Sequence, residues 1–242
     1  MLFTKIPAAV LSAAEGKRAS LSKETPGRVD STLRINEIFL SLQGETSRTG
    51  LPTVFVRLTG CPLRCGYCDT AYAFHEGGTR GIDEVMADVA MHGTPFVCVT
   101  GGEPLAQRGC LTLLRRLADA GYSVSLETSG ALDISEVDAR ISRIVDIKTP
   151  GSGEVDKNRW ENIPLLTAHD EVKFVLCGQA DYEWAAGVTR EYSLAEKCPV
   201  LFSPSHADVR PADLAAWILR DKLPVRMQVQ LHKILWGEAR GR

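Results

Sequence analysis

The chain has 242 residues, of which 44% are hydrophobic and 24% are charged, a composition that suits one large globular domain. The 28 lysines and arginines nearly balance the 30 aspartates and glutamates, and the formal net charge is −2. This balance excludes the basic surface of a nucleic-acid-binding protein or of a protein held on an anionic membrane. We therefore expect a small-molecule partner, with no nucleic acid and no membrane.

The 7 cysteines are spaced unevenly, and three of them lie within residues 61–68. A secreted disulfide-rich protein has a more regular, paired framework, so a reducing, cytoplasmic compartment fits better. No apolar run reaches the length of a membrane-spanning helix. Residues 8–14 have the small apolar composition of a signal peptide, but Pro7 interrupts the stretch, and we predict no export.

Residues 1–32 are rich in Ala, Ser, Lys and Glu and show no sustained apolar period. Such a segment has no apolar face to bury, so we predict a flexible N-terminal extension; a start codon placed too early is the alternative. Residues 33–242 are predicted to form a single domain.

From residue 33 onward, short apolar runs rich in β-branched residues alternate with segments of helical periodicity. We expect strands at residues 53–58, 96–100, 123–127, 143–147, 172–177, 200–203 and 225–231. We expect helices at residues 82–91, 104–120, 181–192 and 212–221. This order predicts an α/β protein with a mainly parallel sheet that forms an open or partial barrel, with its chemistry at the carboxyl ends of the strands.

Three cysteines, Cys61, Cys65 and Cys68, lie on one loop directly after the first expected strand. A structural zinc site needs four protein ligands, whereas a 4Fe-4S cluster held by three thiolates keeps one iron free for another molecule. We therefore predict a 4Fe-4S cluster on these three residues. A zinc site completed by His75 or Cys98 is the alternative.

The Cys-x3-Cys-x2-Cys spacing resembles the signature of the radical S-adenosylmethionine superfamily. The resemblance implies the fold of that superfamily, a partial (β/α)6-type barrel of mainly parallel strands. It also implies that the free iron binds the amino and carboxylate groups of S-adenosylmethionine. An external electron donor such as flavodoxin or ferredoxin then reduces the cluster, which cleaves the cofactor to a 5′-deoxyadenosyl radical. A glycyl-radical activase of a partner protein shares this signature and is an alternative function.

Polar and glycine-rich stretches follow the next strands in order. Residues 100–104 read Thr-Gly-Gly-Glu-Pro, and two glycines allow a close approach of the backbone to a ligand. In the radical superfamily, a Gly-Gly-Glu-Pro stretch at this place contacts the methionine amino group. The residues expected at the cofactor are Tyr67, Gly101, Gly102, Glu103, Glu127, Ser129 and Lys148. Helix capping by Ser129 and an ion pair between Asp146 and Lys148 are the alternative roles.

From Arg34 to the C-terminus, the chain resembles the 7-carboxy-7-deazaguanine synthase family. The resemblance rests on the motifs Leu-Gln-Gly-Glu at residues 42–45, Cys-Asp-Thr at 68–70, Glu-Thr-Ser-Gly at 127–130 and Gln-Leu-His-Lys at 230–233. Members convert 6-carboxy-5,6,7,8-tetrahydropterin into 7-carboxy-7-deazaguanine by a ring contraction that loses ammonia, in queuosine and 7-deazaguanine biosynthesis. The resemblance does not define the oligomeric state, and a homodimer is one of the options.

A bicyclic pterin with a carboxylate needs complementary groups at both of its ends. Glu45 can accept hydrogen bonds from the amino edge, Arg57 can bind the carboxylate, and His232 can hydrogen-bond or exchange a proton. The resemblance also implies a magnesium ion between Thr70 and the substrate carboxylate. The residues expected at the substrate are Gln43, Glu45, Arg57, Thr100 and His232.

For several of these residues, an ordinary structural role is the alternative. Glu45 can be a solvated turn residue, Arg57 can form an ion pair at a strand edge, and His232 on a terminal strand can be a packing residue. A zinc-stabilised binding module is the alternative from another class of protein.

Two features depart from short members of the family. Those members carry Ser-Pro-Lys where this chain has Asp-Ile-Lys at residues 146–148. They also end soon after the histidine motif, with a terminal carboxylate near the substrate, whereas this chain continues through residues 236–242. We therefore expect that contact to be replaced or absent.

Overall fold

The computed structural model describes residues 31–206 and 208–242. Except for Ser31 and Thr32, the predicted N-terminal extension lies outside these residues. The described part forms one sheet with the strand order β3-β1-β2-β4-β5-β6-β7-β8-β9. The strands are β1 (Thr32–Leu42), β2 (Pro52–Leu58), β3 (Gly78–Gly81), β4 (Phe96–Gly101), β5 (Ser123–Thr128), β6 (Ser142–Asp146), β7 (Glu171–Leu176), β8 (Val200–Pro204) and β9 (Arg226–Met227).

The α/β class and the open, mainly parallel sheet are confirmed. Neighbouring strands from β2 to β9 pair in parallel, and β1 pairs antiparallel with both β2 and β3. Because β3 and β9 are the two edges of the sheet, the barrel is not closed. The α-helices are α1 (Ile82–Met91), α2 (Gly109–Asp119), α3 (Gln179–Glu191), α4 (Leu194–Lys197), α5 (Pro211–Asp221) and α6 (Leu231–Trp236).

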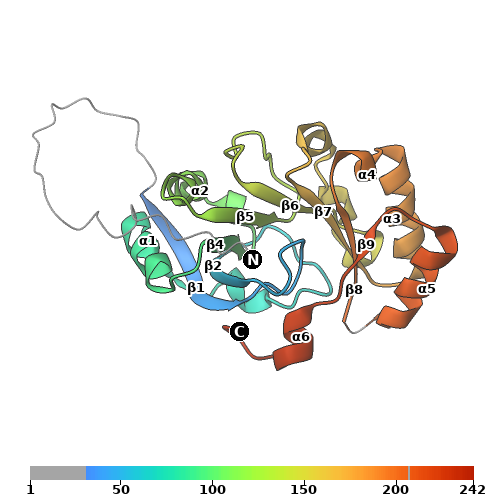
Figure 1. The fold of residues 1–242 in the computed structure, drawn as a ribbon, viewed down its shortest axis with the longest axis horizontal. Coiled ribbons are helices and arrows are strands. Elements are labelled where there is room, and N and C mark those ends of the chain that lie inside the picture. Colours follow the sequence, from blue (N-terminus) through green and yellow to red (C-terminus); the bar gives the residue numbers. More distant parts are fainter. Residues whose placement is uncertain (1–30, 207) are drawn as a thin grey trace, which may run out of the picture.

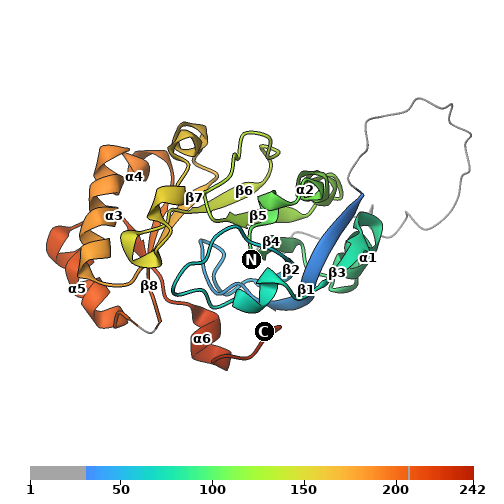
Figure 2. The same ribbon diagram turned by 180° about the vertical axis from the view of Figure 1, so that it is seen from behind.

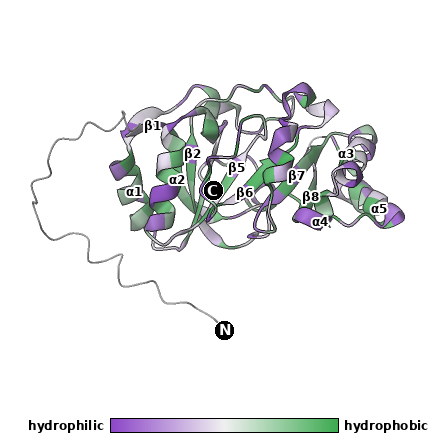
Figure 3. Ribbon diagram, turned by 90° about the horizontal axis from the view of Figure 1, so that it is seen from above, coloured by the Kyte–Doolittle hydropathy of each residue, from purple (hydrophilic) through white to green (hydrophobic). Residues whose placement is uncertain are grey.

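The sheet and the helices share an apolar core. Helices α1 and α2 lie at one end of the sheet and α3, α4 and α5 at the other (Figure 1). Seen from behind, the same two groups flank the loops at the centre of the molecule (Figure 2). Hydrophobic residues concentrate in the central strands, and the helices turn polar residues outward (Figure 3). Most of the parallel strands therefore read as apolar runs, whereas β5 alternates polar and apolar residues.

Strand β1 was not among the predicted strands. Its buried residues Leu33 and Ile35 alternate with polar ones, and farther along the strand Asn36 and Glu37 follow one another. It pairs antiparallel at one side of the sheet, where one face of a strand can stay polar. A search for continuous apolar runs therefore misses it.

The predicted helix over residues 104–120 is wrong in its first part. Residues Pro104–Ala106 form a single 3-10 turn, and the α-helix begins only at Gly109. Between them, Gln107 is extended, and its side-chain amide donates to Arg34 O at 3.0 Å and Thr59 O at 2.9 Å. These bonds hold the residue out of helical geometry.

The predicted strand over residues 225–231 is also wrong beyond its first residues. Only Arg226 and Met227 pair with β8, and residues from Leu231 onward form α6. The reason is a tertiary contact: Leu231 N donates to Gly44 O at 3.1 Å. This bond draws the chain away from the sheet edge toward the loop that follows β1.

Two crossovers contain no α-helix in the described residues, β5 to β6 and β6 to β7. Asn162 ties them together, because its amide donates to Gly130 O and Leu132 O and accepts from Ile134 N. Asp170, which is 1% exposed, accepts from the backbone and guanidinium of Arg143 and from Thr167. Buried polar bonds thus replace helix packing in this region.

Among the described residues, no helix has the length and apolar character that crossing a membrane requires.

We predict that Asp170→Ala lowers the free energy of unfolding by about 3 to 5 kcal/mol, because Arg143 is left buried without its partner. Burial acts to raise the pKa of Asp170, but its bonds to Arg143 and Thr167 outweigh burial and lower it. The folded pKa is therefore below the unfolded pKa, so the stabilisation is present at neutral pH and is lost as the pH falls through the folded value.

Urea titrations of wild type and variant at neutral pH and in mild acid measure both effects. Asp213→Ala is the matched control, because its partner Arg210 is 82% exposed and the pair is screened by solvent. A loss for Asp170→Ala no larger than that for the control would contradict this account.

Candidate active site

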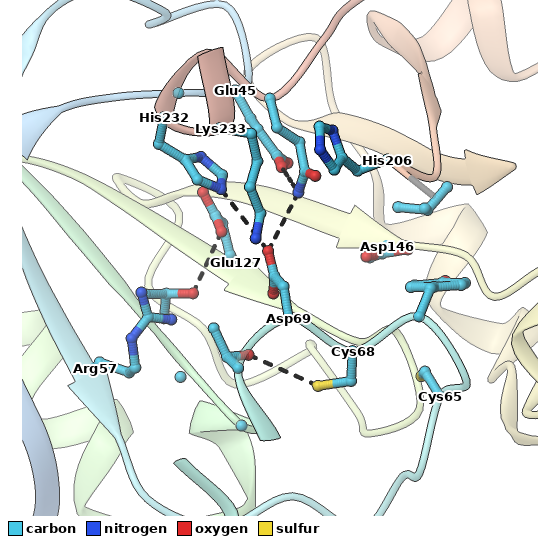
Figure 4. A pocket seen from close by; sticks show the side chains of 18 of the residues that line it. Glu45, Arg57, Cys65, Cys68, Asp69, Glu127, Asp146, His206, His232 and Lys233 are labelled. Atoms are coloured by element: carbon cyan, nitrogen blue, oxygen red, sulfur yellow. Dashed lines mark hydrogen bonds and ion pairs between the residues drawn. The ribbon is translucent and has the colours of Figure 1, made fainter. Parts of the chain in front are cut away.

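A cavity of about 520 Å³ lies at the carboxyl ends of the parallel strands. Its size suits an organic ligand. It brings together every predicted site residue except Glu103, and Figure 4 shows several of them facing one another across the space. The predicted residues that line it are Gln43, Glu45, Arg57, Cys61, Cys65, Tyr67, Cys68, Thr70, Thr100, Gly101, Gly102, Glu127, Ser129, Lys148 and His232.

The cysteine loop supplies three free, half-buried thiols at one side of the cavity. Burial raises the pKa of the Cys61 and Cys65 thiols, and the charge of Lys148 opposes this rise at both residues. In the described part of the chain, no three His, Cys, Asp or Glu side chains converge to hold one metal ion. In a 4Fe-4S cluster each thiolate binds a different iron, and three free thiols on one loop match that ligand set.

The glycines at residues 101 and 102 let β4 approach the start of the cysteine loop. Gly101 has φ 147°, and a Cβ on Gly102 would overlap the carbonyl oxygen of Gly60. The next residue, Glu103, donates its backbone N–H to the same carbonyl at 2.8 Å. Only residues without a side chain fit here, and this contact fixes the position of Cys61 relative to β4.

Glu103 is the predicted site residue that does not line the cavity. The carboxylate is 0% exposed and accepts from Thr128 Oγ1 at 2.9 Å, Ser129 N at 2.7 Å and Leu105 N at 2.9 Å. These bonds join the ends of β4 and β5. The structure therefore gives the Glu103 carboxylate a positioning role, and a contact of this residue with the cofactor stays a prediction.

Four charges alternate in sign along another wall of the cavity; three of them are buried and Asp146 is half-buried. Lys173 Nζ on β7 lies 2.7 Å from Glu45 Oε2 and 3.6 Å from Asp146 Oδ2, and Lys148 Nζ lies 3.0 Å from the same Asp146 oxygen. Asp146 and Lys173 are register partners in the parallel pair β6 and β7. Glu45 is 8% exposed, so it is not a solvated turn residue. The predicted alternative of an Asp146–Lys148 ion pair is present in this row.

Arg57 on β2 forms an ion pair through its Nε, and its two terminal nitrogens make no hydrogen bond within the described residues. Its Nε donates to Glu37 Oε1 at 2.8 Å, and Tyr72 OH donates to the same oxygen at 2.9 Å. Burial acts to lower the pKa of Arg57, but Tyr72 and Glu37 outweigh burial and raise it. The strand-edge ion pair is thus present, and it leaves the two terminal nitrogens of the cavity-lining guanidinium available to an anion.

Glu127 lies at the centre of a polar group formed by three strand ends. Gln43 Nε2 donates to Glu127 Oε1 at 3.2 Å, and Thr100 Oγ1 donates to Glu127 Oε2 at 3.3 Å. Cys98, which is fully buried, donates from Sγ to Glu127 Oε1 at 3.5 Å. Cys98 is therefore directed at Glu127 and is not a fourth ligand of the cysteine loop.

His232 lies on α6 and not on the predicted terminal strand. Its Nε2 is 3.8 Å from Asp69 Oδ2, and a Cβ on Gly44 would come 2.7 Å from its Nδ1. Burial acts to raise the pKa of Asp69, but the nearby His232, with smaller contributions from the charges of Lys233 and Lys173, lowers it to about 2. Gly44 is therefore required for space, and Asp69 carries a negative charge that orients the imidazole.

Thr70, the residue predicted to bind magnesium, lines the cavity just beyond the cysteine loop. It precedes the 3-10 turn Ala71–Phe74, and its Oγ1 is 3.8 Å from Cys68 Sγ.

Two buried polar atoms in the cavity wall have no hydrogen-bond partner within the described residues, Tyr67 OH and Asp146 Oδ1. Burial raises the pKa of Tyr67, so its hydroxyl keeps its proton and can donate. An unpaired buried polar atom is costly, and a bound ligand can remove that cost. Together with three thiols on one loop, these atoms fit a cluster and an organic cofactor.

Comparison with known proteins identifies the family. A sequence model of the Radical SAM superfamily matches residues 55–193, more than half of the chain. The 7-carboxy-7-deazaguanine synthase of Chlorobaculum tepidum is 45% identical over 216 residues, which cover 88% of this chain and 98% of that protein. The enzyme of the same name from Koribacter versatilis is 45% identical over 219 residues, which cover 84% and 97%. The chain belongs to the 7-carboxy-7-deazaguanine synthase family of radical SAM enzymes.

A solved structure agrees with the fold. The crystal structure of QueE from Escherichia coli superposes with a TM-score of 0.69 and covers 83% of this chain and 95% of that one. The two sequences are 22% identical, so this likeness shows the shared radical SAM fold.

The C-terminal segment of this family member stays at the cavity. Residues 237–242 line it, Arg240 pairs with Glu76 at 3.1 Å, and the Arg240 guanidinium lies 3.9 Å from the centre of the Tyr72 ring. The extra residues that distinguish the chain from short family members are thus part of the cavity wall.

Several cavity residues were not predicted from the sequence. A lysine inside the apolar run of β7 was a usable signal for Lys173, because a buried lysine is rare without a partner. Asp69 lies inside the recognised Cys-Asp-Thr motif. Gln230 and Lys233 lie inside the recognised Gln-Leu-His-Lys motif, whereas Tyr72 and Arg240 carry no local signal.

We predict that Gly102→Ala prevents assembly of the cluster, because the new Cβ must displace the Gly60 carbonyl and with it Cys61. Iron and sulfide per chain after anaerobic reconstitution, together with visible absorbance, measure the effect. Gly187→Ala is the matched control: this helical glycine has no atom within 4 Å of the added Cβ and should bind iron as wild type does. Full iron content in Gly102→Ala would show that the glycine contact does not position the loop.

Proposed function

We propose that the chain converts 6-carboxy-5,6,7,8-tetrahydropterin into 7-carboxy-7-deazaguanine with loss of ammonia, in queuosine and 7-deazaguanine biosynthesis. The observation that carries the proposal is the 45% identity to synthases of that name over nearly their whole length. The cavity supports it, because three thiols face Glu45, Arg57 and His232 across one space.

The cofactor is proposed to lie at the side of the cavity nearest the cysteine loop. Cys61, Cys65 and Cys68 would hold the 4Fe-4S cluster, and their number leaves one iron open for S-adenosylmethionine. When bound, the reduced cluster supplies the electron that turns S-adenosylmethionine into a hydrogen-abstracting radical. Tyr67, Asp146 and Lys148 offer a donor, an acceptor and a positive charge to the polar groups of the cofactor.

The substrate is proposed to lie at the opposite side. Glu45 would accept hydrogen bonds from the amino-pyrimidinone edge, and the free nitrogens of Arg57 would bind the carboxylate. His232, held by Asp69 and Gly44, would donate a hydrogen bond to the ring or its carboxylate. Thr100 and Glu127, which are hydrogen-bonded to each other, line the cavity between these groups and the cysteine loop.

A magnesium ion is proposed between Thr70 and the substrate carboxylate. Magnesium binds oxygen ligands and keeps several of its waters, so one hydroxyl, one carboxylate and water suffice.

The remaining expectations stay proposals. The catalytic domain would span residues 33–242, with residues 1–32 as an extension. A flavodoxin or ferredoxin in the cytoplasm would supply the electron, and a homodimer is the oligomeric state that stays open. A glycyl-radical activase and a zinc-stabilised module find no support in the family assignment.

Anaerobic incubation of reconstituted wild-type protein with reductant, S-adenosylmethionine, magnesium and 6-carboxytetrahydropterin tests the proposal. Mass detection should show 7-carboxy-7-deazaguanine. A fully loaded cluster that cleaves S-adenosylmethionine but yields no such product would refute the substrate assignment.

In the same assay, Arg57→Ala should reduce turnover by the equivalent of about 2 to 5 kcal/mol, because the substrate carboxylate loses a charge-assisted partner in a partly dry site. Its iron content and slow unproductive cofactor cleavage should survive, since Arg57 is not on the cysteine loop. Arg210→Ala, an arginine that is 82% exposed in its ion pair, is the matched control and should turn over normally. Equal turnover in the two variants would remove Arg57 from the substrate site.

A further inference from the structure

Lys173 is the buried charge in the cavity wall to which the proposed function gives no task. It lies on β7 in a strand that is otherwise apolar except for Glu171, and it is 9% exposed. Burying an ammonium group costs free energy unless strong partners compensate it. Its partners are Glu45 at 2.7 Å and Asp146 at 3.6 Å, so two carboxylates fix its position.

The contact between Lys173 and Glu45 also determines the protonation state of Glu45. Lys173 Nζ donates to Glu45 Oε2, and Gln230 Nε2 donates to Glu45 Oε1 at 3.0 Å. Burial acts to raise the pKa of Glu45, but the charge and hydrogen bond of Lys173, with the bond from Gln230, lower it below its ordinary value. Without Lys173, burial and the nearby negative charge of Asp69 would favour the protonated acid.

The protonation state of Glu45 sets what it can recognise. A carboxylate only accepts hydrogen bonds, whereas a carboxylic acid also donates one. Both protein contacts of Glu45 are donors, and its remaining lone pairs can accept two further donors. An acceptor-only wall of this kind fits a ring edge that presents two adjacent N–H groups.

We propose that Lys173 is a positioning residue that sets substrate specificity, because it holds Glu45 as an acceptor-only carboxylate and so selects rings with a donor–donor edge. The proposal rests on the proposed function for the placement of a ring at Glu45. A 2-amino-4-oxopyrimidine edge has adjacent N3–H and 2-amino donors. In the 2-oxo counterpart, a carbonyl oxygen replaces the amino group and faces a carboxylate oxygen, which repels it.

The charge balance of the row formed by Glu45, Lys173, Asp146 and Lys148 determines which variants test the role of Lys173. Glu45 and Asp146 balance Lys173 and Lys148, so replacing Lys173 by Met leaves one excess negative charge. Glu45→Gln removes the carboxylate itself and offers an amide that both accepts and donates. In the double variant the row is balanced again, because only the Asp146–Lys148 pair remains charged.

The experiment measures equilibrium binding of two stable probes, pterin-6-carboxylate and lumazine-6-carboxylate, to the cluster-loaded full chain with S-adenosylmethionine. The two differ in the 2-amino and 2-oxo groups. Wild type should prefer the pterin by about 100-fold or more, since buried groups left unpaired strongly disfavour the wrong ligand. Lys173→Met should reduce the preference to less than about 10-fold, and Lys173→Arg should restore most of it.

Two further variants separate specificity from general damage. Lys222→Met, at the exposed C-cap of α5, is the matched control and should keep the wild-type preference. Glu45→Gln should lose the preference, and adding Lys173→Met to it should change the preference no further. If Lys173→Met does not fold, the Glu45→Gln result still decides, because a preserved preference there overturns the proposal.

The outcomes distinguish this proposal from the proposed function. Equal weakening of both probes in Lys173→Met, or a wild type without preference, would overturn the specificity role even if the enzyme makes 7-carboxy-7-deazaguanine. A wild type that discriminates between the probes but makes no 7-carboxy-7-deazaguanine would leave the role of Lys173 standing and refute the reaction.

Discussion

The site depends on the compensation of charges that the sheet buries at the carboxyl ends of its strands. Asp146 and Lys173 are register partners on neighbouring parallel strands, so their side chains meet at the same edge. Lys148 and Glu45 extend this pair in opposite directions, toward the cysteine loop and toward α6. Because none of these buried charges is stable without its neighbours, the row also fixes the loop after β1.

Close backbone contacts place the remaining groups around this row. Gly102 lets β4 approach the cysteine loop, and Gly44 leaves room for the His232 ring. The Glu103 carboxylate joins the ends of β4 and β5. Within the described residues, Tyr67 OH and Asp146 Oδ1 in the cavity wall have no hydrogen-bond partner. The cavity thus has rigid sides and a few polar atoms reserved for ligands.

The sequence predicts what is encoded locally. The cysteine loop, the glycine pair and the apolar parallel strands were all recognisable, because their spacing and composition follow directly from their chemistry. The roles of Lys173 and Glu103 were not predictable, since each depends on partners from distant strands. His232 was placed on the wrong element for the same reason: the bond from Leu231 to Gly44 diverts the chain from the sheet edge.

The central claim is that one cavity holds the cofactor at the cysteine loop and a pterin at Glu45 at the same time. The most direct test is electron paramagnetic resonance of the reduced, reconstituted protein, titrated with S-adenosylmethionine with and without saturating pterin-6-carboxylate. This account predicts that S-adenosylmethionine changes the cluster signal in both titrations, because the two ligands occupy separate ends of the cavity. Loss of that change in the presence of the pterin would mean that the ligands compete for one place, and would contradict the account.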